Sequence, residues 1–447
     1  MWWNQMGSLQ VRDPVAVHVS YFLNINDDPT LPTQEELDDD GSANGDYAGA
    51  TSPGILRGAA AITAAAQVRK RICSGQAPCD KVGTDPLCSS GYKYMFHSCR
   101  IPRATADTFR IYDPSRHKHC IVASRGYFFA VDFIDGESDP LPFNSIVERL
   151  EQCEERAKEL EKRGVPKLGW LTGCPRDFWA ECRSKLLQEG GSKMREAMNA
   201  LESGAFVLCL DQERPSASEA GQLFWNGNGT SGCNRWFDKS VQLICTKNGS
   251  IALVGEHSLF DGSTPMLLCK QIQKNKYNRR RRIMTNHIDG SDTDEKNGVR
   301  DIFGQCWSDG QFVDMSVNVA ANGRQRYRKL TNSVELKTLI YKGYGKPFIK
   351  KGKISPDAYL QLAMQLATYR LLGKQVATYM YEATQTRRFV HGRTETTRTV
   401  SFDSQDFVEA MGPVSKETVD DVEAKYEKLM KLRKAAKTHR AYTTFSF

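Results

Sequence analysis

Several patterns that would narrow the function are absent from this chain of 447 residues. It has no uninterrupted apolar run of about 18 residues, which argues against a membrane-spanning helix. It has no pair of cysteines with C-x-x-C spacing, no G-x-S-x-G elbow and no internal repeat. The opening residues, MWWNQMGSLQVRDPV, lack the basic and then apolar segments of a secretory signal. Membrane proteins, serine hydrolases with that elbow and repeat proteins are therefore disfavoured.

The composition is that of a globular protein with more than one domain. Hydrophobic residues make up 40% of the chain and aromatic residues 10%, which is enough for a sizeable core. The net charge of +8 comes from 61 basic and 53 acidic residues. This mild excess suits an anionic small molecule as well as a nucleic acid, so the charge alone selects neither partner.

Thirteen cysteines are scattered along the chain. Their odd number and irregular spacing indicate reduced, mostly buried thiols in a cytosolic or organelle-matrix enzyme rather than a disulfide framework. His117, His119 and Cys120 are the one group that suggests zinc. They enter an alternating strand pattern whose neighbouring side chains point to opposite faces, so we expect structural roles and no metal site.

Strand and helix patterns interleave along the chain, which predicts an α/β fold or mixed α+β layers. Apolar strands are expected within 119–135 and 205–211, with a helix between them. Ser145 and Glu148 suggest a capping box at the start of that helix, and Gly164 stands past its end. Ser355, Pro356 and Asp357 mark the start of a later helix, and a last helix is expected over about 415–439.

Two polar segments interrupt this pattern. Residues 26–54 are acidic and rich in Gly, Pro, Ser and Asn, which predicts a surface insert. Residues Arg279–Arg282 form a basic run that we interpret as a solvated linker. A nuclear-localisation or polyanion-binding segment is the alternative.

His257 lies in a stretch that suggests chemistry, GEHSLFDGST. Asn248-Gly249 between two alternating apolar runs predicts a hairpin, so His257 follows the second hairpin strand. A histidine there can act as a general base, and Asp261 can orient its ring or hold an arginine. From these residues alone, a structural histidine and a catalytic base both remain open.

The residues around His257 resemble the choline/carnitine acyltransferases. The chain reads NRWFDKSVQLICTKNGSIALVGEHSLFDG, where that family has N-R-W-[FY]-D-K, a hairpin and E-H-[SA]-x-x-[DE]-G. Flanking blocks also match, namely LCSSGYKYMFHSCRIP, YGKPFIKKGKISPDAYLQLAMQLATYRLLG and YEATQTRRFVHGRTETTRTVS. The order and spacing agree from about residue 10 to residue 440.

The resemblance implies reversible acyl transfer between coenzyme A and a hydroxyl, with His257 as the general base for direct attack. Asp261 and Arg393 are expected to pair in support of the site. The family's CoA-binding lysines match Lys346 and Lys350. Its nucleotide loop matches the residues that end at the helix start, which are Lys350, Lys351, Gly352, Lys353, Ile354, Ser355, Pro356 and Asp357.

Tyr381 and Thr394 match hydroxyl donors to the carnitine carboxylate. The choline enzymes have an apolar residue in place of Thr394, so this threonine favours L-carnitine, and we expect a short acyl group such as acetyl. The CoA ester is a co-substrate, and no permanently bound cofactor, metal or nucleic acid is expected. The resemblance further implies a monomer in a mitochondrial, peroxisomal or cytosolic compartment.

The resemblance also predicts a chloramphenicol-acetyltransferase-like fold of two related lobes. We assign residues 1–312 to an N-lobe with the catalytic histidine and 313–447 to a partial C-lobe with the CoA and carnitine motifs. The family's D-R-H and S-T-S elements do not occur here, and its members begin well upstream. We therefore expect a chain truncated at both ends. The alternative function is an inactive product that at most binds CoA or a partner chain.

Overall fold

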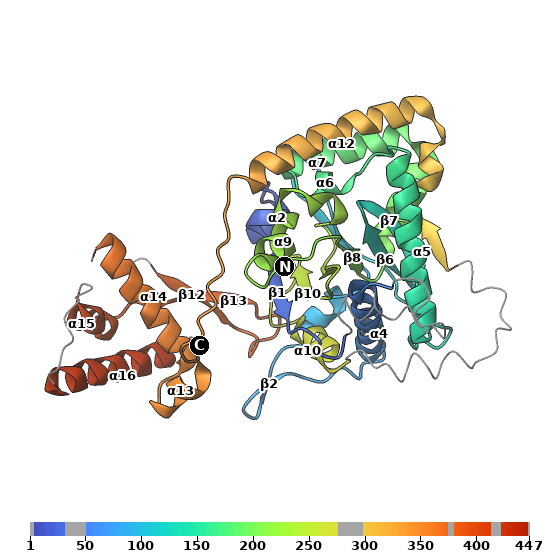
Figure 1. Cartoon of the computed structure of the whole chain (residues 1–447). Coiled ribbons are helices and arrows are strands. Elements are labelled where there is room, and N and C mark those ends of the chain that lie inside the picture. Colours follow the sequence, from blue (N-terminus) through green and yellow to red (C-terminus); the bar gives the residue numbers. More distant parts are fainter. Residues whose placement is uncertain (1–3, 32–50, 276–297, 374–379, 413–421, 446–447) are drawn as a thin grey trace, which may run out of the picture. The chain divides into compact units, whose positions relative to one another are not determined.

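The structure, a computed structural model, describes residues 4–31, 51–275, 298–373, 380–412 and 422–445 (Figure 1). The chain divides into two compact units. Unit 1 comprises Met1–Pro78 and Ser89–Thr338, and unit 2 comprises Cys79–Cys88 and Leu339–Phe447.

A seven-stranded mixed sheet forms the centre of unit 1, in the order β1-β10-β9-β8-β6-β7-β11. β6, β8 and β9 run parallel to one another, and the other neighbours pair antiparallel. The strand bounds are Tyr21–Ile25 (β1), His119–Ser124 (β6), Tyr127–Asp132 (β7), Val207–Leu210 (β8), Val241–Cys245 (β9), Ile251–Gly255 (β10) and Val299–Asp301 (β11).

Helices cover both faces of this sheet (Figure 1). One face packs against α4 (Pro53–Cys73), α5 (Phe143–Lys162) and α10 (Met266–Lys274). The other packs against α7 (Arg176–Glu189), α8 (Gly191–Ser203), α9 (Ala220–Asn226) and α12 (Gly310–Thr331). Alternate strand residues serve the two faces: Val122 joins the first core and Ile121 the second. Burial on both faces explains the nearly continuous apolar strands, and the layers confirm the predicted α/β class.

Short elements complete unit 1. Two strands, β4 (Ser98–Ile101) and β5 (Thr108–Ile111), form a separate antiparallel pair. The short helices are α2 (Val15–His18) and α6 (Gly169–Thr172), and the helical turns are Gln5–Leu9 (η1), Ser90–Tyr94 (η2), Gly227–Gly229 (η3), Ser231–Asn234 (η4) and Gly304–Ser308 (η6).

Unit 2 is built from helices and a two-stranded ribbon, β12 (Tyr381–Gln385) and β13 (Thr394–Arg398). Its small core joins Ala358 and Leu362 with Phe407 and Ala435. Arg387 holds segment 79–88 through Asp80, 3.0 Å away, and the Cys88 carbonyl, 2.9 Å away. The remaining bounds are β2 (Lys81–Val82), β3 (Asp85–Pro86), α13 (Lys346–Lys351), α14 (Pro356–Leu372), α15 (Phe402–Met411) and α16 (Val422–Phe445).

Several expected boundaries need correction. The proposed division between 312 and 313 falls inside α12, whose Phe312 and Val319 pack in the core of unit 1 beside Trp179. The compact units instead divide after Thr338. Helix α12 therefore belongs to unit 1, because its apolar side chains pack in the same core as the sheet.

The expected surface insert is also too wide. Residues 32–50 lie outside the described residues, but both flanks belong to the fold. Asp28 is buried and pairs with buried Arg57 at 3.3 Å, and α4 begins at Pro53 with Ser52 as its N-cap. The charged segment 279–282 lies outside the described residues.

The helix termini were predicted with mixed success. The capping box at Ser145 is wrong, because α5 already begins at Phe143 with Pro142 as its N-cap residue. Gly164 does follow the helix with a φ of +67°, as predicted. Ser355 is the N-cap residue of α14, also as predicted. The last helix begins at Val422 and continues beyond the expected end to Phe445.

The cysteines confirm the expected reduced state. All thirteen are free thiols, of which only Cys73 and Cys79 are exposed and Cys88 is half-buried. Burial raises the pKa of the Cys209 and Cys245 thiols to about 12, which keeps them protonated and unreactive. Among the described residues, no helix is both long and apolar enough to cross a membrane.

Candidate active site

His257 lies two residues after Gly255, the last residue of β10, as the hairpin pattern predicted. Its side chain is 40% exposed, and its Nδ1 atom lies 3.4 Å from Oδ1 of Asp261, which is buried. The turn after the strand brings these two side chains together. An imidazole whose Nδ1 faces a carboxylate has its ring orientation restrained, and its Nε2 is the nitrogen suited to proton transfer.

Tyr21 provides a second contact to the imidazole. Its ring meets that of His257 edge to face, with centroids 4.9 Å apart. Tyr21 pairs with Gly255 across the β1 and β10 ladder. A Cβ atom on Gly255 would lie only 2.5 Å from the Tyr21 ring, so glycine is required for this approach. The sequence reasoning missed Tyr21, because it lies in a distant strand and carries no motif.

The element Asn234–Lys239 lies directly before β9 and is buried throughout. Arg235 forms a two-pronged pair with Asp211 at 2.7 and 2.6 Å. Asp238 accepts a hydrogen bond from the Trp179 indole at 2.7 Å. Burial lowers the pKa of Lys239 to about 8. This signature therefore forms part of the core beneath the hairpin.

Unit 2 carries the lysines expected to bind CoA. Lys346 and Lys350 lie four residues apart on α13, so they share one face of this helix, and both are exposed. The loop that follows turns at Lys353, which has a φ of +59°, and ends at the start of α14. The helix thus presents two cations together, which suits a phosphate group.

Tyr381 and Thr394 lie on the same face of the β12 and β13 ribbon. Tyr381 pairs with Arg398 and Thr394 pairs with Gln385, so four residues, or roughly 13 Å, separate them along the strands. This face is the more exposed one, since Glu382, Thr384 and Thr397 on the opposite face are more buried. A ligand that touches both hydroxyls must lie along the exposed face.

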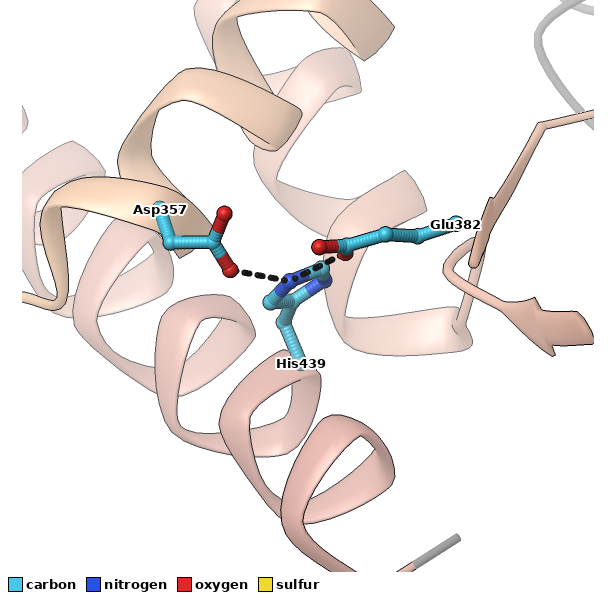
Figure 2. Close-up of side chains that lie close together, drawn as sticks. All are labelled: Asp357, Glu382 and His439. Atoms are coloured by element: carbon cyan, nitrogen blue, oxygen red, sulfur yellow. Dashed lines mark ion pairs between the residues drawn. The ribbon is translucent and has the colours of Figure 1, made fainter. Parts of the chain in front are cut away.

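The covered face of the ribbon is anchored by His439 (Figure 2). This buried side chain from α16 places Nε2 at 3.3 Å from Glu382 and 3.5 Å from Asp357 at the start of α14. Burial and the neighbouring Asp357 carboxylate raise the pKa of Glu382. One imidazole thus links Asp357, at the end of loop 350–357, to the strand that carries Tyr381. Sequence reasoning did not find His439, since α16 is distant from both partners along the chain.

These three side chains are also the group whose donor atoms could hold a metal ion within the described part of the chain. His117, His119 and Cys120, the group in which the sequence suggested zinc, have different surroundings. His119 shares a hydrogen bond through Nε2 with the Ala200 carbonyl at 2.8 Å, and burial lowers its pKa to about 4. Burial also raises the pKa of the Cys120 thiol above its ordinary value. The geometry of His119 and Cys120 fits structural roles.

The expected site residues are divided between the two units. His257 and Asp261 are adjacent in unit 1. Lys346, Lys350, Tyr381 and Thr394 all belong to unit 2, as does Arg393. The expected pair of Asp261 with Arg393 joins the two units and stays a prediction.

Comparison with known proteins identifies the family of this chain. The family described as choline/carnitine O-acyltransferase matches residues 1–445. Mouse carnitine O-acetyltransferase is 29% identical over 453 residues, which cover 99% of this chain and 65% of that protein. The mitochondrial carnitine O-acetyltransferase of Saccharomyces cerevisiae is 29% identical over 381 residues, covering 83% of this chain and 52% of that protein.

Human choline O-acetyltransferase is 31% identical over 296 residues, covering 64% of this chain and 37% of that protein. A chloramphenicol acetyltransferase chain aligns with a TM-score of 0.23 and 12% identity, covering 60% of this chain and 90% of that chain. An alignment of that quality does not bear on the fold. The family match spans nearly the whole chain, which spans 65% of the mouse relative's length. This chain belongs to the choline/carnitine O-acyltransferase family.

Proposed function

We propose that this protein transfers a short acyl group, acetyl above all, reversibly between coenzyme A and the hydroxyl of L-carnitine. The observation that carries the proposal is the geometry of His257. It lies at the end of a buried strand with Nδ1 against Asp261 and a partly exposed ring. Family membership supports the reaction class, since the family described as choline/carnitine O-acyltransferase matches residues 1–445.

In the proposed reaction, His257 Nε2 removes the proton from the carnitine hydroxyl, and the oxygen attacks the thioester carbonyl directly. The carbon–sulfur bond of the tetrahedral intermediate then breaks, and the departing CoA thiolate takes the proton from His257. In the reverse direction the same nitrogen removes the proton from the CoA thiol. Asp261 stabilises the imidazolium that forms in either case. A single base thus serves two nucleophiles, and no acyl-enzyme intermediate is required.

Unit 2 supplies the substrate contacts in this proposal. Lys346 and Lys350 pair with the CoA 3′-phosphate as fixed positive charges. The loop 350–357 follows the nucleotide. Tyr381 and Thr394 donate hydrogen bonds to the carnitine carboxylate from the exposed face of the ribbon. We propose that Arg393 pairs with Asp261 and so supports the histidine from this unit.

L-Carnitine is proposed over choline for two reasons. Thr394 offers a hydroxyl donor, and a carboxylate is the group that carnitine has and choline lacks. The mouse relative named for carnitine also aligns with 99% of the chain, whereas the human relative named for choline aligns with 64%. We further propose a monomer in an intracellular compartment, which the reduced thiols support.

The test is release of free thiol from acetyl-CoA in the presence of either acceptor. We expect release with L-carnitine and at least tenfold less with choline. Equal rates would contradict the carnitine assignment, and loss of the preference in a Thr394→Val variant would support it. Absence of turnover with both acceptors would contradict acyl transfer by this chain and favour a protein that only binds CoA.

A further inference from the structure

Two residues that flank His257 have no part in the proposed reaction. Glu256 and Ser258 are both buried, at 2% and 0% exposure. The Ser258 backbone N–H donates to Oε2 of Glu256 at 3.2 Å, and its hydroxyl donates to Oε1 of the same carboxylate. These two hydrogen bonds join the residue before His257 to the residue after it. The conformation of the segment that carries the imidazole is therefore fixed from both sides.

Arg100, from β4, binds both of these residues. Its Nη1 atom donates to Glu256 Oε1 at 3.1 Å and to Ser258 Oγ at 2.9 Å. Its Nε donates to Asp107 at 2.6 Å, and its Nη2 donates to the Ser8 carbonyl at 3.0 Å. The guanidinium is fully buried. The planar guanidinium directs its N–H donors to all of these acceptors simultaneously, which the single ammonium group of a lysine cannot do.

Asp107 connects Arg100 to two further arginines. Arg176 approaches it at 2.6 Å and Arg12 at 2.9 Å, and Arg176 also pairs with Asp238 at 2.7 Å. Burial alone would raise the pKa of Asp107, but the charges of Arg176 and Arg100 outweigh burial and hold that pKa below its ordinary value. The carboxylate therefore stays charged, and it fixes the orientation of the Arg100 guanidinium.

We propose that Arg100, acting through Glu256, is a positioning residue for His257. This inference rests on the proposed function and adds to it the residues that hold the base in place. Arg100 fixes the Glu256 carboxylate, the carboxylate fixes the backbone on either side of His257, and the imidazole then meets Asp261 and Tyr21 in one orientation. A base held this way needs no rearrangement before proton transfer.

Arg100→Lys and Glu256→Gln test the proposal, with Arg12→Lys as the matched control. Arg12 belongs to the same network through Asp107 and does not contact Glu256 or Ser258 in any hydrogen bond described above. We expect kcat for carnitine acetylation to fall about tenfold to hundredfold in the first two variants, with both KM values within about twofold. Arg12→Lys should keep kcat within about twofold.

A second readout does not depend on turnover. NMR spectra of protein with isotope-labelled histidine show one ring resonance for each of the eight histidines. The resonance that disappears in His257→Gln is that of His257. We expect this signal to shift in Arg100→Lys and Glu256→Gln and to stay in place in Arg12→Lys. If the parent shows no turnover, the proposed function fails while this measurement still decides the positioning role.

Two results would overturn the inference. One is an unmoved His257 signal in folded Glu256→Gln protein, and the other is an equal shift in Arg12→Lys. If Arg100→Lys does not fold, Glu256→Gln carries the test, because it keeps the size of the side chain and removes only its charge. A rise in KM with an unchanged kcat in Glu256→Gln would likewise contradict the proposal.

Discussion

Unit 1 and unit 2 differ in how completely they bury their apolar residues. The sheet of unit 1 is covered on both faces by helices, and its central strands are wholly buried. The most exposed large hydrophobic side chains of the described residues all belong to unit 2, namely Leu339, Leu371, Val390 and Phe402. Because stability grows with buried apolar area, unit 1 is expected to be the more stable of the two.

The same division separates two parts of the proposed reaction. Unit 1 holds the proposed base, His257, beside Asp261 and Glu256, which are both buried. Unit 2 holds the residues proposed to bind substrates, of which Lys346, Lys350 and Tyr381 are exposed. Substitutions in unit 1 should therefore change kcat or stability, whereas substitutions on the surfaces of unit 2 should change KM.

The largest expected effect tests the difference in packing. Leu243→Ala, in the centre of β9, should lower the free energy of unfolding by about 3–5 kcal/mol, because the covered sheet cannot collapse onto the cavity. Leu362→Ala in unit 2 is equally buried but should cost only about 2 kcal/mol, since its small core can relax.

Urea unfolding can follow the two units separately. All seven tryptophans lie within the ranges of unit 1, so tryptophan fluorescence reports that unit, and hydrogen exchange of α14 reports unit 2. An equal loss in both variants, or a greater loss for Leu362→Ala, would contradict the comparison.

A pH titration gives the next largest effect. Burial lowers the pKa of His97 to about 3 and that of His119 to about 4, both in unit 1. The unfolded chain binds protons on these histidines below about pH 6.5 while the folded chain does not, so stability falls as the pH drops from there. We expect about 1–2 kcal/mol per histidine between pH 7 and pH 5.

His119→Gln is the matched variant for this titration, because an amide can still donate to the Ala200 carbonyl. It should show a shallower loss of stability than the parent over the same range, followed by tryptophan fluorescence. A loss of the same steepness in parent and variant would show that His119 does not contribute.

The smallest expected effect concerns substrate binding by unit 2. Lys346→Ala should raise the KM for CoA about tenfold, because one fixed positive charge near the phosphate is lost, and kcat should stay nearly constant. Lys342→Ala, an exposed lysine just before α13, is the control and should change neither constant. A larger rise in the KM for L-carnitine than for CoA would refute this placement of Lys346.

Local signals predicted a substantial part of this fold. The apolar runs in β6 and β8, the Asn248-Gly249 hairpin and the Ser355 start of α14 are encoded by neighbouring residues, and all appear in the structure. The position of His257 at the end of a strand followed from the same hairpin. These features depend on period, turn and cap residues, which a single sequence displays.

Other features depend on contacts between distant segments and were not predictable in this way. Tyr21 meets His257 only because β1 joins the sheet beside β10. His439 reaches Asp357 and Glu382 only because α16 packs onto the ribbon and α14. The capping box at Ser145 failed because the helix extends past a favourable local signal to Pro142.

The measurement that tests the central claim most directly is carnitine-dependent release of thiol from acetyl-CoA by the parent and by a His257→Ala variant. Both proteins are compared at equal concentration and with equal tryptophan fluorescence. The account predicts turnover by the parent and a loss of at least about a thousandfold in the variant, since alanine cannot accept the proton. Activity of the variant close to that of the parent would contradict the assignment of His257 as the general base.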